Sequence, residues 1–301
     1  MRVLIPIDGS VSSANAVDLF AERATHMTVK PEAELVNIQL PMPIRVLNQW
    51  GLEELRKACE AEGAKVLQKP AQAIAAAGVK LGQRVLFGVP GDVIAEEADA
   101  MNADLILMGA RGATAAESFF LGSVSRAVLA HTARPVLLAR GCALPEKENM
   151  TIVLAADGSN YANQAADFII AHPEFFGRTP TVKVVNVVPD YSDVEKAGPK
   201  EFEPLLRHAR ARREEENDKL WKEATSAVLE RLQKAGFTVE GIKLAGDPAE
   251  QIALYANAHA DLIVMGSHGL GRIKTAVLGS VAMHTGAITH LPMLLMRIAQ
   301  A

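Results

Sequence analysis

The chain has 301 residues, of which 49% are hydrophobic, and its formal net charge is −4. This length allows two ordinary domains, each with its own core. This negative net charge gives no reason to expect the strongly basic face typical of nucleic-acid binding, so polyanion binding is disfavoured. Cys59 and Cys142 share no metal-ligand spacing, and the apolar run before Asp8 is too short for a signal peptide or a membrane span. We therefore expect a cytoplasmic protein with free thiols and no membrane or nucleic-acid partner.

In chain order, the first half alternates short apolar runs with helical patterns. Helical periodicity covers 12–27, 51–78 and 91–102. Pro70 falls inside the second of these patterns, so we expect a kink or a break there. The apolar runs predict strands of a parallel sheet covered on both faces, at 3–7, 34–40, 84–87, 104–108 and 135–139.

The second half repeats the first. Asp8 aligns with Asp157 at an offset of 149, whereas Gly109 aligns with Gly266 at an offset of 157. The charged stretch 192–216 is the expected site of the extra residues, in a surface connection, where added length costs little entropy. Strands of the second half are expected at 152–156, 182–188, 240–244, 261–265 and 293–297.

This alternation of strands and helices predicts two tandem doubly wound α/β domains, at residues 1–141 and 150–301. Each is expected to be a five-stranded parallel sheet with helices on both faces. We expect a pseudo-twofold axis between the domains, with the last strands of the two halves pairing across it within one chain. Further association into a homodimer is left open.

A glycine-rich stretch follows the fourth strand of each half. The sequence reads "GARGATAAESFFLGS" at 109–123 and "GSHGLGRIKTAVLGS" at 266–280, with the same spacing of glycines and of the final serine. In an open parallel sheet, ligands bind at the carboxyl ends of the strands, which is where these stretches begin. We expect glycines with positive φ to turn backbone N–H groups around an anion, and Ser123 to cap the following helix. The alternative is that the glycines only make tight turns.

The spacing G-xx-G-x9-GS resembles the signature of the ATP-binding branch of the universal stress protein family. The likeness includes the "DGS" after each first strand and the "GD" turns, matched at Asp92 and Asp247, and it covers nearly all of both halves. It implies a Rossmann-like fold of the adenine nucleotide alpha hydrolase-like type. It also implies ATP as the ligand, with Mg²⁺ as a candidate companion, and a role in regulation or stress adaptation.

The resemblance also implies which residues contact the nucleotide. The first strand end would contact adenine and ribose, the second would offer backbone groups to adenine, and the glycine stretch would hold ribose and phosphates. In the first half the implied residues are Pro6, Asp8, Ile38, Met108, Gly109, Arg111, Gly112, Gly122, Ser123 and Val124. In the second half they are Asp157, Val187, Met265, Gly266, His268, Gly269, Gly279, Ser280 and Val281. Asp8 is in addition the candidate for contact with ATP-bound Mg²⁺.

The two halves fit this pattern unequally. Ala155 replaces Pro6, and Gly286 lies inside the last predicted helix, so we rank the first half as the better nucleotide site. The chain has no Walker A motif, kinase-like loop, catalytic triad or HExxH spacing, and no residue is assigned a catalytic role. The predicted function is ATP binding with little or no hydrolysis. Two alternatives stay open: an interaction module that binds no nucleotide, and a slow ATP hydrolase. The sequence indicates neither the stress nor the protein partner.

Overall fold

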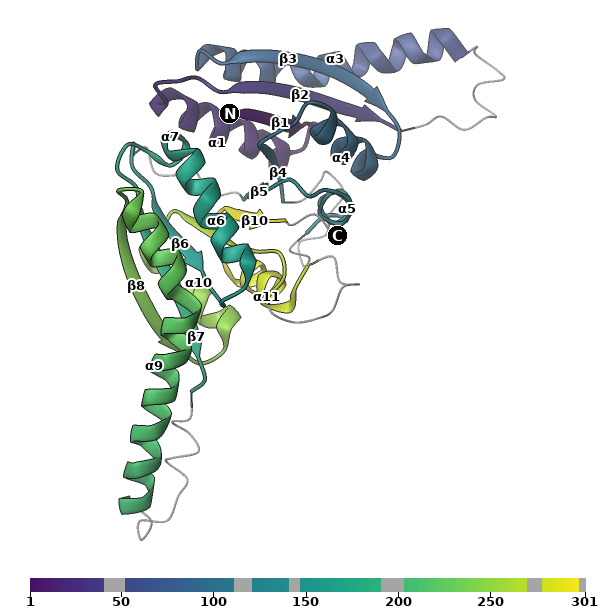
Figure 1. The fold of residues 1–301 in the computed structure, drawn as a ribbon. Helices are drawn as coiled ribbons and strands as arrows, with labels where there is room; N and C mark the ends of the chain where they lie inside the picture. The colour runs from purple at the N-terminus through teal and green to yellow at the C-terminus, as the bar shows by residue number, and fades with distance from the viewer. Residues whose placement is uncertain (41–51, 111–120, 141–146, 191–202, 270–277, 298–301) are drawn as a thin grey trace.

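The structure, a computed structural model, describes residues 1–40, 52–110, 121–140, 147–190, 203–269 and 278–297, with the side chains of 203–209 excepted. Within these ranges both halves alternate strands and helices (Figure 1). The first half contains β1 Arg2–Pro6, α1 Val11–His26, β2 Glu32–Gln39, α3 Leu52–Ala76, β3 Lys80–Phe87, α4 Pro90–Ala100, β4 Leu105–Gly109, α5 Ser123–His131 and β5 Val136–Ala139. The second half contains β6 Thr151–Ala155, α6 Asn160–Ala171, α7 Pro173–Phe176, β7 Thr181–Val188, α9 Glu203–Lys234, β8 Thr238–Ala245, α10 Pro248–His259, β9 Leu262–Gly266, α11 Ser280–Ile288 and β10 Met293–Met296.

The strands form one ten-stranded sheet in the order β3-β2-β1-β4-β5-β10-β9-β6-β7-β8. Each half contributes five parallel strands, and the order of the second half mirrors that of the first. The halves join where β5 and β10 pair antiparallel, with Leu137 opposite Leu294. The predicted doubly wound fold and the predicted pairing of the last strands are therefore confirmed.

The sheet is covered on both faces, and each face has a core that runs through both halves. The core under α1, α3, α6, α7 and α9 includes Phe20, Ile74 and Leu232, whereas the core under α4, α5, α10 and α11 includes Ile94, Val128 and Ile252. The central strands are buried on both sides, which explains why they read as continuous apolar runs.

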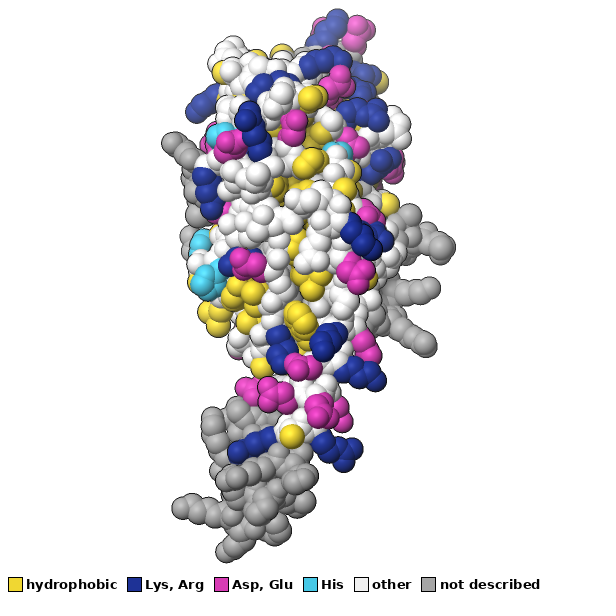
Figure 2. Space-filling view, turned by 60° about the vertical axis from the view of Figure 1, so that its left-hand side comes forward, with side chains coloured by type: hydrophobic (Ala, Val, Ile, Leu, Met, Phe, Trp, Pro, Cys, Tyr) yellow, Lys and Arg dark blue, Asp and Glu magenta, His cyan; other side chains and the backbone are white. Residues whose placement is uncertain are grey.

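The extra residues of the second half become, in their described part, a longer helix. β7 follows β2 at an offset of 149, but β8 follows β3 at 158, so the added length lies before β8. α9 has 32 residues against 25 in α3, and its first turns project beyond the sheet (Figure 1). Basic and acidic side chains are interspersed on the face of the molecule that Figure 2 shows, including the described part of the projecting helix. The insertion was expected in a surface connection; residues 191–202 of it lie outside the described part.

Of the kink or break expected at Pro70, the break does not occur. α3 runs from Leu52 to Ala76 with Pro70 inside it. A proline removes one intrahelical hydrogen bond and crowds the preceding turn. The flanking residues Leu67, Ala71 and Ile74 are buried against the sheet, and this packing offsets the local cost and keeps the helix continuous.

A buried arginine ties the two halves together away from the β5–β10 pair. Arg23 of α1 is 1% exposed, and its guanidinium donates to the backbone carbonyls of Phe175, Lys147 and Glu148 at 3.0, 2.9 and 2.8 Å. Burial lowers the pKa of Arg23, while neighbouring carboxylates, Glu22 foremost, act in the opposite direction. Arg23 of the first half thus binds three backbone carbonyls of the second half that lie outside its strands.

Candidate functional site

Each half places an aspartate at the carboxyl end of its first strand. Asp8 and Asp157 follow β1 and β6, and each accepts a hydrogen bond at Oδ1 from the backbone N–H two residues later, at 3.0 Å. The glycine between these two groups has a φ of 79° in the first half and 83° in the second, so the chain turns sharply there. The turn fixes the carboxylates at the sheet edge where the predicted ligand would lie.

The second strand of each half runs past its inner neighbour. Pairing of β6 with β7 ends at Ala155 and Val185, whereas pairing of β7 with β8 continues to Val188. The carbonyl of Val185 accepts from Ala156, and Val187, two residues later, faces the same side, where strand β6 has ended. The backbone edge at Val187 therefore borders a space at the sheet edge. Ile38 has the equivalent position in the first half, because β1 pairs with β2 only to Val36.

A backbone hydrogen bond closes the glycine stretch of each half. Gly122 donates to Ala110 at 3.0 Å, and Gly279 donates to Ser267 at 2.7 Å. This bond brings the end of the fourth strand beside the start of the next helix, α5 in the first half and α11 in the second. The first N–H groups of a helix lack intrahelical acceptors and carry partial positive charge, so this end of α11 suits an anion.

The predicted N-cap is wrong, and the predicted glycine conformation is not found among the described residues of the two stretches. The N-cap residues are Gly122 and Gly279, without a side-chain cap, and Ser123 is the first residue of its helix. Both glycine and serine suit a helix N-cap, so the sequence alone does not choose between them. In addition, no glycine of the two stretches within the described residues has a positive φ. The anion nest expected from such glycines is therefore absent from the described part.

Close packing accounts for the first glycine of each stretch. A Cβ on Gly109 would lie 2.6 Å from the backbone of Ser12, and a Cβ on Gly266 would lie 2.7 Å from the Cβ of Tyr161. These two glycines let α1 and α6 approach the sheet. Gly269 differs, because a Cβ there would lie 2.6 Å from Oδ2 of Asp157. Gly269 thus brings the glycine turn against the strand-end carboxylate.

These elements enclose a cavity in each half, and the two cavities differ in size. The cavity of the second half is about 600 Å³ and that of the first half about 100 Å³. The described residues of the larger cavity include residues of β6, β7, α10, β9 and α11: Ala155, Ala156, Asp157, Val185, Asn186, Val187, Pro248, Ile252, Met265, Gly266, Ser267, His268, Gly269, Leu278, Gly279, Ser280, Val281, Ala282, Met283 and His284.

The structure brings together most of the predicted site residues. Every residue assigned in the second half lines the larger cavity. In the first half the smaller cavity is lined by Pro6, Asp8, Ile38, Met108, Gly109 and Val124. Gly122 and Ser123 lie at the adjoining start of α5, while Arg111 and Gly112 lie outside the described residues. The ranking of the first half as the better site stays a prediction about binding, but the cavity volumes favour the opposite order.

The equivalence of Asp92 and Asp247 is also wrong. α4 and α10 both begin with a proline, Pro90 and Pro248, and aligning these prolines places Val89 opposite Asp247. Asp247 is the N-cap of α10 and accepts from the backbone N–H of Glu250 at 3.0 Å. Asp92 lies in the first turn of α4 and pairs with His131 at 2.6 Å. Neither aspartate lines the described part of a cavity wall.

The wall of the larger cavity is hydrogen-bonded to the first half. Arg297, 7% exposed, donates from Nη1 to Ser267 Oγ at 3.1 Å and from Nε to the Thr132 carbonyl at 3.3 Å. Ser267 Oγ also lies 3.2 Å from Nδ1 of His268. Burial lowers the pKa of Arg297, while Tyr161 acts in the opposite direction. The turn that carries His268 and Gly269 is therefore held from across the domain boundary.

Sequence reasoning missed several residues of the site. Asn37 donates to the Ile7 carbonyl and Asn186 to the Ala156 carbonyl, both at 2.8 Å, which fixes the strand end just before each aspartate. The repeated asparagine at matching positions was the available signal. Ser267 gave no such signal, because the first half has Ala110 in its place.

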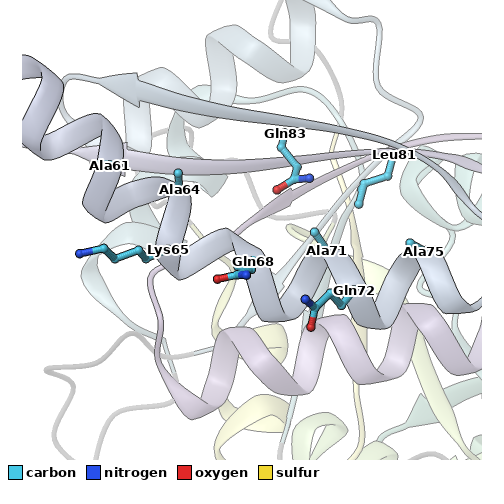
Figure 3. A pocket seen from close by; sticks show the side chains of 9 residues that line it. All are labelled: Ala61, Ala64, Lys65, Gln68, Ala71, Gln72, Ala75, Leu81 and Gln83. Atoms are coloured by element: carbon cyan, nitrogen blue, oxygen red, sulfur yellow. The ribbon is translucent and has the colours of Figure 1, made fainter.

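A further hollow, of about 630 Å³, lies on the surface between α3 and β3 (Figure 3). Its described lining has small and amide side chains, including Ala64, Gln68 and Gln83, with neither a carboxylate nor a helix start. Lys65 is the one charged side chain of this described lining, and it forms an ion pair with Glu62 on the exposed helix surface, so the hollow lacks the carboxylate and helix start found at the strand-end cavities. Among the described residues there is no cluster of metal-ligating side chains and no helix long and apolar enough to cross a membrane.

Comparison with known proteins identifies the family. The model of the universal stress protein family matches residues 1–140 and again residues 148–297. A universal stress protein of Methanocaldococcus jannaschii is 32% identical over 152 residues, which cover 49% of this chain and 84% of that protein. One from Mycobacterium tuberculosis is 24% identical over 296 residues, 93% of this chain and 91% of its own.

Similarity to solved structures extends over the whole chain. The crystal structure of a universal stress protein from Archaeoglobus fulgidus covers 98% of both chains with a TM-score of 0.70 at 21% sequence identity. At this identity the likeness shows the fold, while the family follows from the two sequence matches. The chain therefore belongs to the universal stress protein family, with the family domain present twice in tandem.

Proposed function

We propose that this chain is an ATP-binding regulatory protein that hydrolyses ATP slowly or not at all. The observation that carries the proposal is the cavity of about 600 Å³ at the carboxyl ends of the second-half strands. Small-molecule sites in proteins have volumes of about 300–1,000 Å³, combining apolar walls with a few placed polar groups. This cavity is of that kind.

The groups around the cavity match the parts of a nucleotide. Met265 and Ile252 offer apolar surface to a purine, and the backbone edge at Val187 offers hydrogen bonds to its rim. The start of α11, at Gly279 and Ser280, suits the phosphates. Asp157 would hold a ribose hydroxyl or a phosphate-bound Mg²⁺. The corresponding role of Asp8 in the first half belongs to the same proposal.

Slow hydrolysis follows from the chemistry of the described lining. Rapid phosphoryl transfer needs a metal clamp, a positioned water and charge stabilisation of the moving group. Asp157 is the single carboxylate of the described cavity wall, and its Oδ1 already accepts from Ser159. Such a site favours a nucleotide that stays intact and acts through its presence, with a change in shape or partners as the output.

The test begins with the purified protein, denatured without added nucleotide, and mass spectrometry of any released ligand. Titration calorimetry with ATP and Mg²⁺, with GTP and cyclic AMP as competitors, then gives affinity and base preference. We expect released ATP or direct binding of ATP. If no ATP is released and no binding is measured at millimolar ATP, the result would favour a module that binds no nucleotide and would refute the proposal.

A separate assay addresses hydrolysis. Phosphate release is measured for the native chain and for Asp157→Asn, which keeps the size of the side chain. We expect release near the background rate for both. Steady turnover that is lost in Asp157→Asn or Asp8→Asn would instead assign a slow ATP hydrolase.

A further inference from the structure

The two halves share one fold, yet their cavities differ about sixfold in volume, 600 against 100 Å³. A site for a drug-sized ligand needs about 300 Å³ or more. The first-half cavity is below this size, and the second-half cavity is above it. The two halves also differ at two places that border these cavities.

The first difference is a close contact between helices α4 and α5. A Cβ on Gly91 would lie 2.3 Å from the Cβ of Ala127 and 3.3 Å from its Cα. Real Cβ atoms do not approach one another this closely, so α4 and α5 can lie at this spacing only because position 91 is glycine. These two helices form one wall of the first-half cavity, through Ile94 of α4 and Val124 of α5.

The second half has larger residues at both positions of this contact. When the helices are aligned on their first prolines and first serines, Ala249 matches Gly91 and His284 matches Ala127. Because Ala249 carries a Cβ, α10 and α11 cannot make the same close contact at this position. Here Thr285 Oγ1 donates to the Ala249 carbonyl at 3.4 Å, and His284 is exposed and lines the cavity.

The second difference is the size of the residues at the ends of the first strands. In the first half, Pro6 and Ile7 border the cavity, whereas Ala155 and Ala156 occupy these places in the second half. Pro6 is larger than Ala155 and leaves less space at this end of the cavity, whereas the Ile7 side chain belongs to the core under α1 and α3.

We propose that the second half is the nucleotide-binding half, and that the Gly91–Ala127 contact keeps the first half closed to a ligand of ATP size. This inference rests on the proposed function and adds how many nucleotides one chain binds and which half binds them. One chain would hold one nucleotide, and the first half would serve as a structural partner that supports the cavity wall through Arg297.

The experiment is titration calorimetry of the full chain with ATP and Mg²⁺. We expect one site per chain in the native protein, and loss of this site in Gly269→Val, whose new side chain meets Asp157. Two sites in the native chain, or one site that survives Gly269→Val, would overturn the inference and leave the proposed function standing. No site at millimolar ATP would overturn the proposed function itself.

Two further variants test the closing contact. Gly91→Ala should separate α4 from α5 and raise the stoichiometry from one to two. Should Gly91→Ala fail to fold, the variant Pro6→Ala enlarges the same cavity from the strand end. Folded variants that stay at one site would refute the closure. The reciprocal change Ala249→Gly should bind ATP more weakly than Glu250→Gly, which places a glycine on the exposed side of the same helix.

Discussion

Replacing Arg23 with methionine removes a buried guanidinium that donates to three backbone carbonyls at 2.8–3.0 Å. Each hydrogen bond from a charged donor contributes about 1.5–3 kcal/mol, but these values do not add, and removing a buried charge also relieves its desolvation cost. The Phe175 carbonyl would stay buried without its donor, whereas those of Lys147 and Glu148 can reach water. We therefore expect the free energy of unfolding to fall by about 3 kcal/mol.

Urea unfolding followed by circular dichroism measures this change. With a slope of about 3 kcal/mol per M, the midpoint should fall by about 1 M. The matched control is Arg231→Met, whose guanidinium pairs with Asp167 at 2.6 Å on the exposed surface, where ion pairs contribute about 0–1 kcal/mol. Equal midpoints for the two variants would refute the conclusion that Arg23 joins the halves.

Three further predictions follow from individual contacts. Gly269→Val should remove ATP binding while far-ultraviolet circular dichroism stays native, because the clash is with the Asp157 carboxylate at the cavity; retained affinity would contradict this. Asp247→Ala should lower the free energy of unfolding by about 1 kcal/mol through loss of an N-cap, measured by urea midpoint, and an equal loss in Asp92→Ala would argue against it. Burial lowers the pKa of His172, so the unfolded chain binds its proton more readily, and stability should fall as the pH drops through about 6.5. This fall should be smaller in His172→Gln, and an unchanged pH profile would contradict it.

The strands could be predicted well because the burial of a strand shows in its own residues. Strands covered on both faces show as apolar runs, and the repeat supplied each run twice, so predicted and observed strands agree to within a few residues. The insertion was harder to place, since charged residues suit both a surface loop and an exposed helix. α9 shows that its described part is helical.

Features that depend on packing between distant segments could not be predicted. Pro70 was expected to kink or break its helix, but α3 continues through it, with its buried face packed against the sheet. The Gly91–Ala127 contact joins residues on two different helices, and nothing in either helix alone reveals it. The relative size of the two cavities depends on such contacts, which is why motif fit favoured the first half while the geometry favours the second.

The candidate site was predictable as a location but not in its detail. Parallel-sheet topology placed the aspartates and glycine stretches at one edge, and all the assigned second-half residues line one cavity. The roles of the glycines were not predictable, because a glycine that admits a helix and one that admits a ligand look alike in sequence. Gly266 packs against Tyr161, whereas Gly269 faces Asp157.

The most direct measurement is a crystal structure of the chain grown with Mg²⁺ and a non-hydrolysable ATP analogue. We expect a single nucleotide in the second half, with its phosphates at the start of α11 and its base against the backbone edge at Val187. A nucleotide in the first-half cavity alone, or phosphates bound away from Gly279 and Ser280, would contradict this expectation.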